Sequence, residues 1–175
     1  MTAKAQQITL SDLNRLSAPE FTQALSGIFE NTSWIPEQVY QNRPFTSVDH
    51  LHEAMVALVE KADSDAKLAL ICEHPELAGR AAVRGELTPE STAEQAGAGL
   101  DACTQEEFDT LTVLNQTYRE KFGFPFILAV RGHNRASVIA EFRRRSRLTP
   151  EQEMFESLRQ IYKIARFRLD DLIVE

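Results

Sequence analysis

Apolar residues recur every three or four positions along almost the whole chain, which is the spacing of amphipathic helices. Start signals precede several of these stripes: Ser17-Ala-Pro-Glu20 and Thr104-Gln-Glu-Glu107 have the capping-box pattern, and Ser47 and Thr149 stand at capping positions. The pattern predicts an all-α fold, with one domain over residues 1–175 and about seven to nine helices of unequal length.

Three short polar segments interrupt this pattern. A helix over 64–73 is expected to end near His74, because Pro75 disfavours α conformation in the residue before it. The second segment, Ser91-Thr-Ala-Glu-Gln95, has a serine three positions before a glutamate, which predicts a capping box at a helix start. The third runs from Phe122 through Gly-Phe-Pro to Arg131. Its apolar part suits either a buried extended segment or the start of a helix.

Composition narrows the class of protein. The net charge of −7 argues against non-specific nucleic-acid binding, and we interpret the arginine run at 143–147 as a solvated helix end. No apolar run approaches the roughly 18 residues that a membrane span needs. The two cysteines, Cys72 and Cys103, are too few for a disulfide framework and predict reduced thiols in a cytoplasmic protein.

Each polar segment carries groups that could bind an anion or move a proton. An imidazole can take or give a proton near neutral pH, so His74 is a candidate general acid–base; the alternative is a histidine that interacts with the end of its own helix. A helix start at Ser91 would offer N–H groups to an anion, and Gln95 adds an amide, although capping alone also explains this segment. Arg131 suits carboxylate recognition, whereas the aromatic residues before it are equally suited to the core.

The histidines do not indicate a metal site. His50 and His52 are two positions apart on a predicted helix and therefore point in different directions. No ladder of cysteine, histidine and aspartate accompanies them, so we expect no bound metal.

Taken together, the three segments resemble the OHCU decarboxylase family, where OHCU is 2-oxo-4-hydroxy-4-carboxy-5-ureidoimidazoline. The resemblance rests on Cys-Glu-His74-Pro75-Glu-Leu-Ala-Gly79, then Ser91-x-x-Glu94-Gln95, then Leu114-Asn-Gln-x-Tyr118-Arg-x-Lys-Phe122-Gly-Phe-Pro-Phe126, in family order and at family spacing. It covers nearly the whole chain. It implies an all-α enzyme that needs no cofactor and converts OHCU to (S)-allantoin with loss of carbon dioxide in urate catabolism.

The resemblance also implies which residues act. His74 matches the family's catalytic histidine and Pro75 a neighbouring substrate contact; Glu94 is a second candidate for catalysis. The implied substrate-binding residues form two runs followed by one arginine. They are Ser91, Thr92, Ala93, Glu94 and Gln95 in the first run, Phe126, Ile127, Leu128, Ala129 and Val130 in the second, and then Arg131. We expect the three segments to form three walls of one cleft.

Other functions remain open from the sequence. The expected ligand is a small ureide, with no nucleic-acid or membrane partner, and a homodimer is an oligomeric state common in the family. A related lyase or hydrolase on another ureide would use the same cleft. A non-catalytic helical interaction module would use the segments only as caps and turns.

Overall fold

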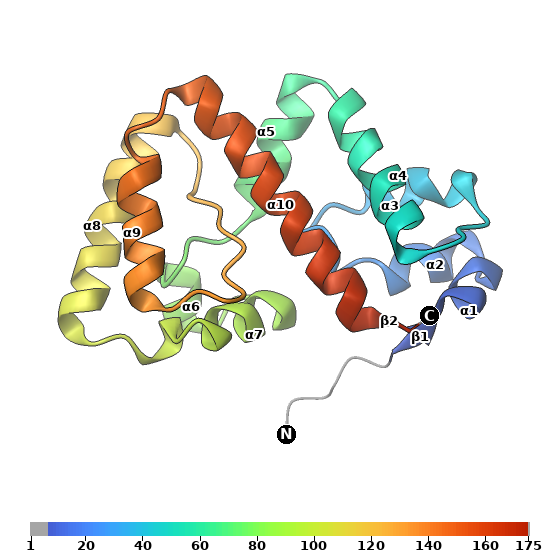
Figure 1. Ribbon diagram of the computed structural model, residues 1–175, viewed down its shortest axis with the longest axis horizontal. Coiled ribbons are helices and arrows are strands. Elements are labelled where there is room, and N and C mark those ends of the chain that lie inside the picture. Colours follow the sequence, from blue (N-terminus) through green and yellow to red (C-terminus); the bar gives the residue numbers. More distant parts are fainter. Residues whose placement is uncertain (1–6, 175) are drawn as a thin grey trace. The chain divides into compact units, whose positions relative to one another are not determined.

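The computed structural model describes residues 7–174, and over that range the chain is helical almost throughout (Figure 1). The predicted all-α class is confirmed. Of the ten α-helices in this range, three have only five or six residues. The elements are β1 (Ile8–Thr9), α1 (Leu10–Arg15), α2 (Ala18–Ala24), α3 (Trp34–Val39), a 3-10 helix (Tyr40–Asn42), α4 (Val48–Lys61), α5 (Ser64–Glu73), α6 (Arg80–Arg84), α7 (Pro89–Gly97), a second 3-10 helix (Leu100–Ala102), α8 (Gln105–Phe122), α9 (Arg135–Arg145), α10 (Pro150–Leu172) and β2 (Ile173–Val174).

The chain divides into two compact units. The first runs to Leu70 and resumes at Tyr162, and the second comprises Ile71–Ile161. In the first unit, β1 and β2 pair in parallel, with Ile8 opposite Ile173. Apolar side chains of α1 to α4 form its core, because their stripes at helical spacing face inward: Leu13, Phe21, Ile35, Val39, Leu51, Met55 and Val59 are all completely buried.

The core of the second unit is aromatic and is built around α8. Tyr118 is buried, and its ring lies 4.6 Å from that of Phe122 and 5.8 Å from that of Phe142 on α9, measured between centroids. Phe142 stacks on Phe126 at 3.9 Å. Aromatic pairs at such distances add stabilisation beyond the area that they bury. This cluster therefore fixes the residues that follow α8, which include the third polar segment.

Local start signals fixed the ends of several helices as expected. Ser17 and Glu20 form a capping box on α2, and Thr104 and Glu107 form one on α8. Thr149 and Gln152 make the reciprocal pair at the start of α10, at 3.0 and 3.2 Å. At the other end of α8, Gly123 adopts the left-handed conformation with φ 77°, which is the common helix stop.

The capping box on α8 predicts a pH-dependent contribution to stability. The Thr104 N–H donates to Glu107 at 2.9 Å, and this bond, with Arg135 beside it, holds the pKa of the Glu107 carboxyl below its usual value. The stabilisation is present above the unfolded pKa of about 4.3 and is lost as the pH falls through the lower folded value. Glu107→Gln should lower Tm at pH 7 by more than it does near pH 3. Glu106→Gln, one position earlier in the same helical turn, is the control and should show a smaller difference between the two pH values.

Candidate active site

His74 lies directly after α5, at the start of the loop that leads to α6. Its backbone N–H donates to Ile71 O at 3.2 Å, and its side chain is only 6% exposed. Pro75 follows and is half-buried. The helix thus ends where the sequence predicts, and the proline turns the chain so that the imidazole is placed in a buried position instead of on an exposed helix end.

Gln95 on α7 holds the same loop. Its Oε1 accepts from the Ala78 N–H at 2.9 Å, and its Nε2 donates to Glu76 O at 3.3 Å. Ala78 adopts a left-handed conformation with φ 49°, which costs a residue with a Cβ roughly 1–2 kcal/mol. Gly79 leaves no room for a side chain, because a Cβ there would lie 2.7 Å from Glu76 Cβ. The loop therefore has a tight, strained shape that depends on the Gln95 amide.

Removing that amide should destabilise the loop measurably. Gln95→Leu leaves the buried Ala78 N–H without its acceptor, which costs about 1–3 kcal/mol. We expect a lower free energy of unfolding and faster hydrogen exchange of the Ala78 amide. Gln116→Leu on the exposed side of α8 removes an amide of the same size and should change neither. Unchanged exchange in Gln95→Leu would show that the loop keeps its shape without the glutamine.

The predicted capping box at Ser91 is wrong. Helix α7 begins two residues earlier, at Pro89, and Thr88 is its cap, accepting from the Ser91 N–H at 3.3 Å. The reason is a competing local signal: proline is favoured in the first helical turn, and threonine is a good capping residue. Ser91 and Glu94 therefore lie inside the helix, and the Ser91 N–H is not free for an anion.

The helix divides the predicted run 91–95 between two faces. Ser91, Glu94 and Gln95 are spaced three and four apart and so share one face of α7, where Ser91 and Gln95 are buried and Glu94 is half-buried. Thr92 and Ala93 are exposed, and the Thr92 hydroxyl donates to Thr88 O. The face with Gln95 is the one that meets the loop after His74.

The third segment is neither helix nor strand. Phe126, Ile127, Leu128, Ala129 and Val130 are all buried, and Arg131 after them is exposed. A buried irregular backbone needs partners for its polar groups. Arg145 donates to Ile127 O, and Gln160 Oε1 accepts from the Ala129 N–H at 3.0 Å. Of the two options left open by the sequence, the buried non-helical segment is correct.

Arg145 belongs to a fully buried polar cluster that the sequence did not reveal. It donates to Glu153 and lies over the Phe126 ring at 4.5 Å, and both charged side chains are completely buried. The Tyr118 hydroxyl also donates to Glu153, and burial next to this carboxylate raises the pKa of Tyr118. The interpretation of 143–147 as a solvated helix end is therefore wrong for Arg145. The available signal in the sequence was helical spacing, which places Arg145 on the same buried face of α9 as Val138 and Phe142.

Helix α8 contacts both the loop and the third segment. Asn115 Nδ2 donates to Leu77 O at 2.9 Å, and one turn later the Tyr118 ring packs 5.4 Å from the Phe126 ring. These contacts lie within the second unit, as do all the predicted site residues. The arrangement into three walls of one cleft stays a prediction.

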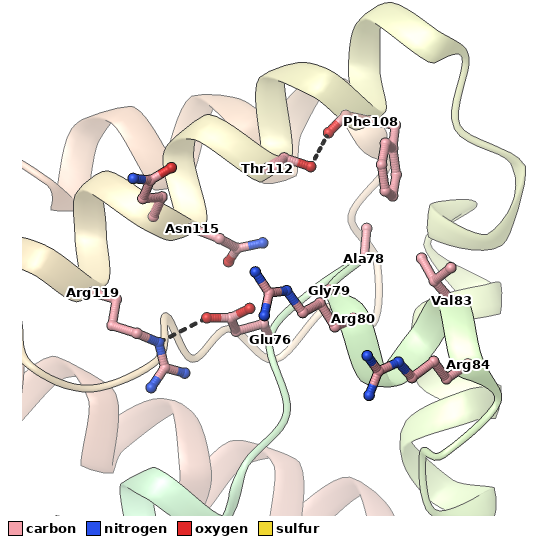
Figure 2. A pocket seen from close by; sticks show the side chains of 11 residues that line it. Glu76, Ala78, Gly79, Arg80, Val83, Arg84, Phe108, Thr112, Asn115 and Arg119 are labelled. Atoms are coloured by element: carbon pink, nitrogen blue, oxygen red, sulfur yellow. Dashed lines mark hydrogen bonds and ion pairs between the residues drawn. The ribbon is translucent and has the colours of Figure 1, made fainter.

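A pocket of about 680 Å³ lies on the same loop, between α6 and α8 (Figure 2). None of the predicted site residues lines it. Its loop wall is made of Glu76, Ala78 and Gly79, which follow His74 and Pro75 in the chain. The loop thus has residues for a candidate active site at its start and a separate hollow along its later part.

Two further observations concern the described residues as a whole. Between residues 7 and 174, no three histidine, cysteine, aspartate or glutamate side chains converge in a way that could hold a metal ion. No helix in that range is long and apolar enough to cross a membrane.

Comparison with known families gives one match. The model of the OHCU decarboxylase family matches residues 14–170. The chain is 40% identical to a uric acid degradation bifunctional protein of Bacillus sp. (strain TB-90), over 95% of this chain and 32% of that protein. It therefore spans about a third of the length of that relative.

Two other relatives are matched over more of their length. A 2-oxo-4-hydroxy-4-carboxy-5-ureidoimidazoline decarboxylase of Haloferax volcanii is 39% identical, over 93% of this chain and 95% of that protein. A crystal structure of (S)-allantoin synthase superimposes with a TM-score of 0.78 at 32% identity, over 95% of this chain and 54% of that one.

Proposed function

The chain belongs to the OHCU decarboxylase family, and on that premise we propose that it is a carboxy-lyase that converts OHCU to (S)-allantoin in uric acid degradation. The observation that carries the proposal is the family match over residues 14–170. The matched residues run through both compact units, so we treat residues 1–175 as one functional domain. No cofactor is needed in this scheme, because the substrate itself can accept the electrons.

The chemistry requires little more than orientation and proton transfer. When the bond between the ring carbon and the carboxylate breaks, carbon dioxide leaves and its electron pair forms a double bond to the neighbouring ring carbon. The π pair of the former ring C=N moves onto the nitrogen, which takes a proton. The neighbouring ring carbon then takes a proton while the hydroxyl loses its own and becomes a carbonyl. Delivery of that proton to one face makes the allantoin a single enantiomer. Positioning and one proton relay can together supply several orders of magnitude in rate.

We assign the proton relay to His74. The side chain is buried, so an imidazole there can exchange a proton with the substrate hydroxyl or carboxylate while shielded from bulk water. Pro75 contributes a contact beside it. The tight loop after it, held by Gln95, keeps the imidazole in one position, which is what a proton donor to one face of a ring requires.

We assign substrate orientation to the other two segments. Ser91, Glu94 and Gln95 share the face of α7 that meets the loop. Glu94 and Gln95 hold the ureido and ring N–H groups, Gln95 through the Oε1 lone pair that the Ala78 N–H does not use. In the third segment, Ile127 C=O and Ala129 N–H are already bonded to Arg145 and Gln160. The substrate is therefore held by the other peptide groups between Phe126 and Val130, with Arg131 near its carboxylate.

A direct assay tests the activity. OHCU is generated in solution from urate, and its disappearance and the optical activity of the allantoin formed are followed with and without the full chain. We expect faster disappearance and an excess of (S)-allantoin. Spontaneous decay at the same rate, or a racemic product, would overturn the proposal. A panel of other ureides in the same assay identifies a related lyase or hydrolase.

A further inference from the structure

The pocket between α6 and α8 is strongly cationic for a protein of this charge. Arg80 and Arg84 on α6 and Arg119 on α8 line it, and Glu76 is the one acidic residue among its lining side chains. The chain as a whole has a net charge of −7. Three arginines therefore line a hollow on a protein whose net charge is negative.

Two of these arginines have no hydrogen-bond or ion-pair partner among the described residues. Arg119 donates to Glu76 at 2.9 Å, but among residues 7–174 no hydrogen bond or ion pair engages the Arg80 or Arg84 guanidinium. The two residues are one helical turn apart, and their side chains extend in the same direction from α6 (Figure 2). Like charges at this spacing repel each other, and a shared anion would remove that repulsion.

The rest of the pocket suits a small ligand. Phe108 gives it an aromatic wall, and Ala78 and Gly79 on the loop side add no bulky side chain. Asn115 also lines it, and the Oδ1 of this residue is a buried acceptor with no donor among the described residues, which suits an O–H or N–H group on the ligand. The volume of about 680 Å³ is within the range of small-molecule sites.

We propose that this pocket binds a small oxyanion, a phosphate or carboxylate group, at Arg80 and Arg84, the two arginines that extend in the same direction from α6. The planar guanidinium fork matches the paired oxygens of either group. A bound anion would lie near the loop at Ala78 and Gly79, in the stretch that follows His74. The proposal concerns binding alone and is independent of the OHCU activity.

Calorimetric titration of the full chain tests the proposed anion binding. About 0.15 M salt is present so that long-range attraction of the anion to the charged surface is screened. Inorganic phosphate is the probe in one arm and malonate in the other, and the tighter of the two identifies the type of oxyanion. The double variant Arg80→Gln/Arg84→Gln should weaken binding by at least about tenfold, because two charge-assisted contacts are lost. Hydrogen exchange over 76–79 should slow when the anion is added to the unmodified chain.

A matched control is available in the same unit. Arg143→Gln/Arg147→Gln removes two exposed arginines that are also four positions apart, and it should leave the affinity unchanged. Equal weakening in both double variants would mean general electrostatic attraction, and absence of binding in both arms would mean that the pocket takes no oxyanion. Either result overturns the proposal.

Discussion

Replacing His74 with glutamine should reduce the rate of OHCU decarboxylation by about 10²- to 10⁴-fold, the range that a positioned general acid–base contributes. Glutamine keeps a polar side chain of similar length in this buried position but cannot transfer a proton near neutral pH. The residual allantoin should also lose its enantiomeric excess, because proton delivery would then come from solvent. The measurement is the same coupled assay from urate, read by absorbance for the rate and by circular dichroism for the stereochemistry.

The control is another histidine in the same chain. His50 is half-buried in the first compact unit, and His50→Gln removes an imidazole without touching the loop after α5. We expect its rate and product stereochemistry to equal those of the unmodified chain. Far-ultraviolet circular dichroism should show that both variants are folded. If His74→Gln kept the full rate and full stereospecificity, the role assigned to His74 would be wrong.

Helix starts were predictable wherever one short signal acted alone. The boxes at Ser17 and Thr104 each involve residues three positions apart, so the sequence contains everything that determines them. At α7 two such signals compete within four residues, and Thr88-Pro89 prevailed over Ser91. A proline in the first turn is already fixed at a helical φ, which is why the earlier start is favoured.

The contacts that shape the candidate site could not be predicted in the same way. Gln95 holds Ala78 from 17 positions away, and Asn115 holds Leu77 from 38. Such pairs form only once helices pack, and no local pattern specifies them. The sequence could therefore identify His74 and Gln95 as chemically interesting but not that the Gln95 amide is bonded to the loop after His74.

Arg145 was wrongly predicted to be exposed to solvent. Charge and neighbouring arginines suggested a solvated residue, since charged side chains are almost never fully buried unless paired. Its partner, Glu153, lies on the next helix and itself looks like an ordinary acidic residue in the first turn of α10. Either charge alone would be too unfavourable to bury, and the two meet only in the packed structure.

The second large effect is expected at this pair. Arg145→Met leaves the Glu153 carboxylate buried without its counter-charge and removes the donor to Ile127 O. Breaking a buried ion pair from one side costs about 3–5 kcal/mol, which for a chain of this length corresponds to a fall in Tm of roughly 6–20 °C. Thermal unfolding followed by circular dichroism measures it. We also expect faster hydrogen exchange over 126–130.

Two further variants distinguish the effect of burial on stability from the effect of charge. Arg144→Met breaks the pair with Glu141, whose side chains are 54% and 29% exposed, and an exposed pair contributes only about 0–1 kcal/mol. Adding Glu153→Gln to Arg145→Met removes the uncompensated charge and keeps an acceptor for the Tyr118 hydroxyl, so part of the lost stability should return. Equal losses in Arg144→Met and Arg145→Met would contradict the buried cluster. Because the same cluster holds the Ile127 backbone, the double variant should recover Tm more fully than it recovers decarboxylation.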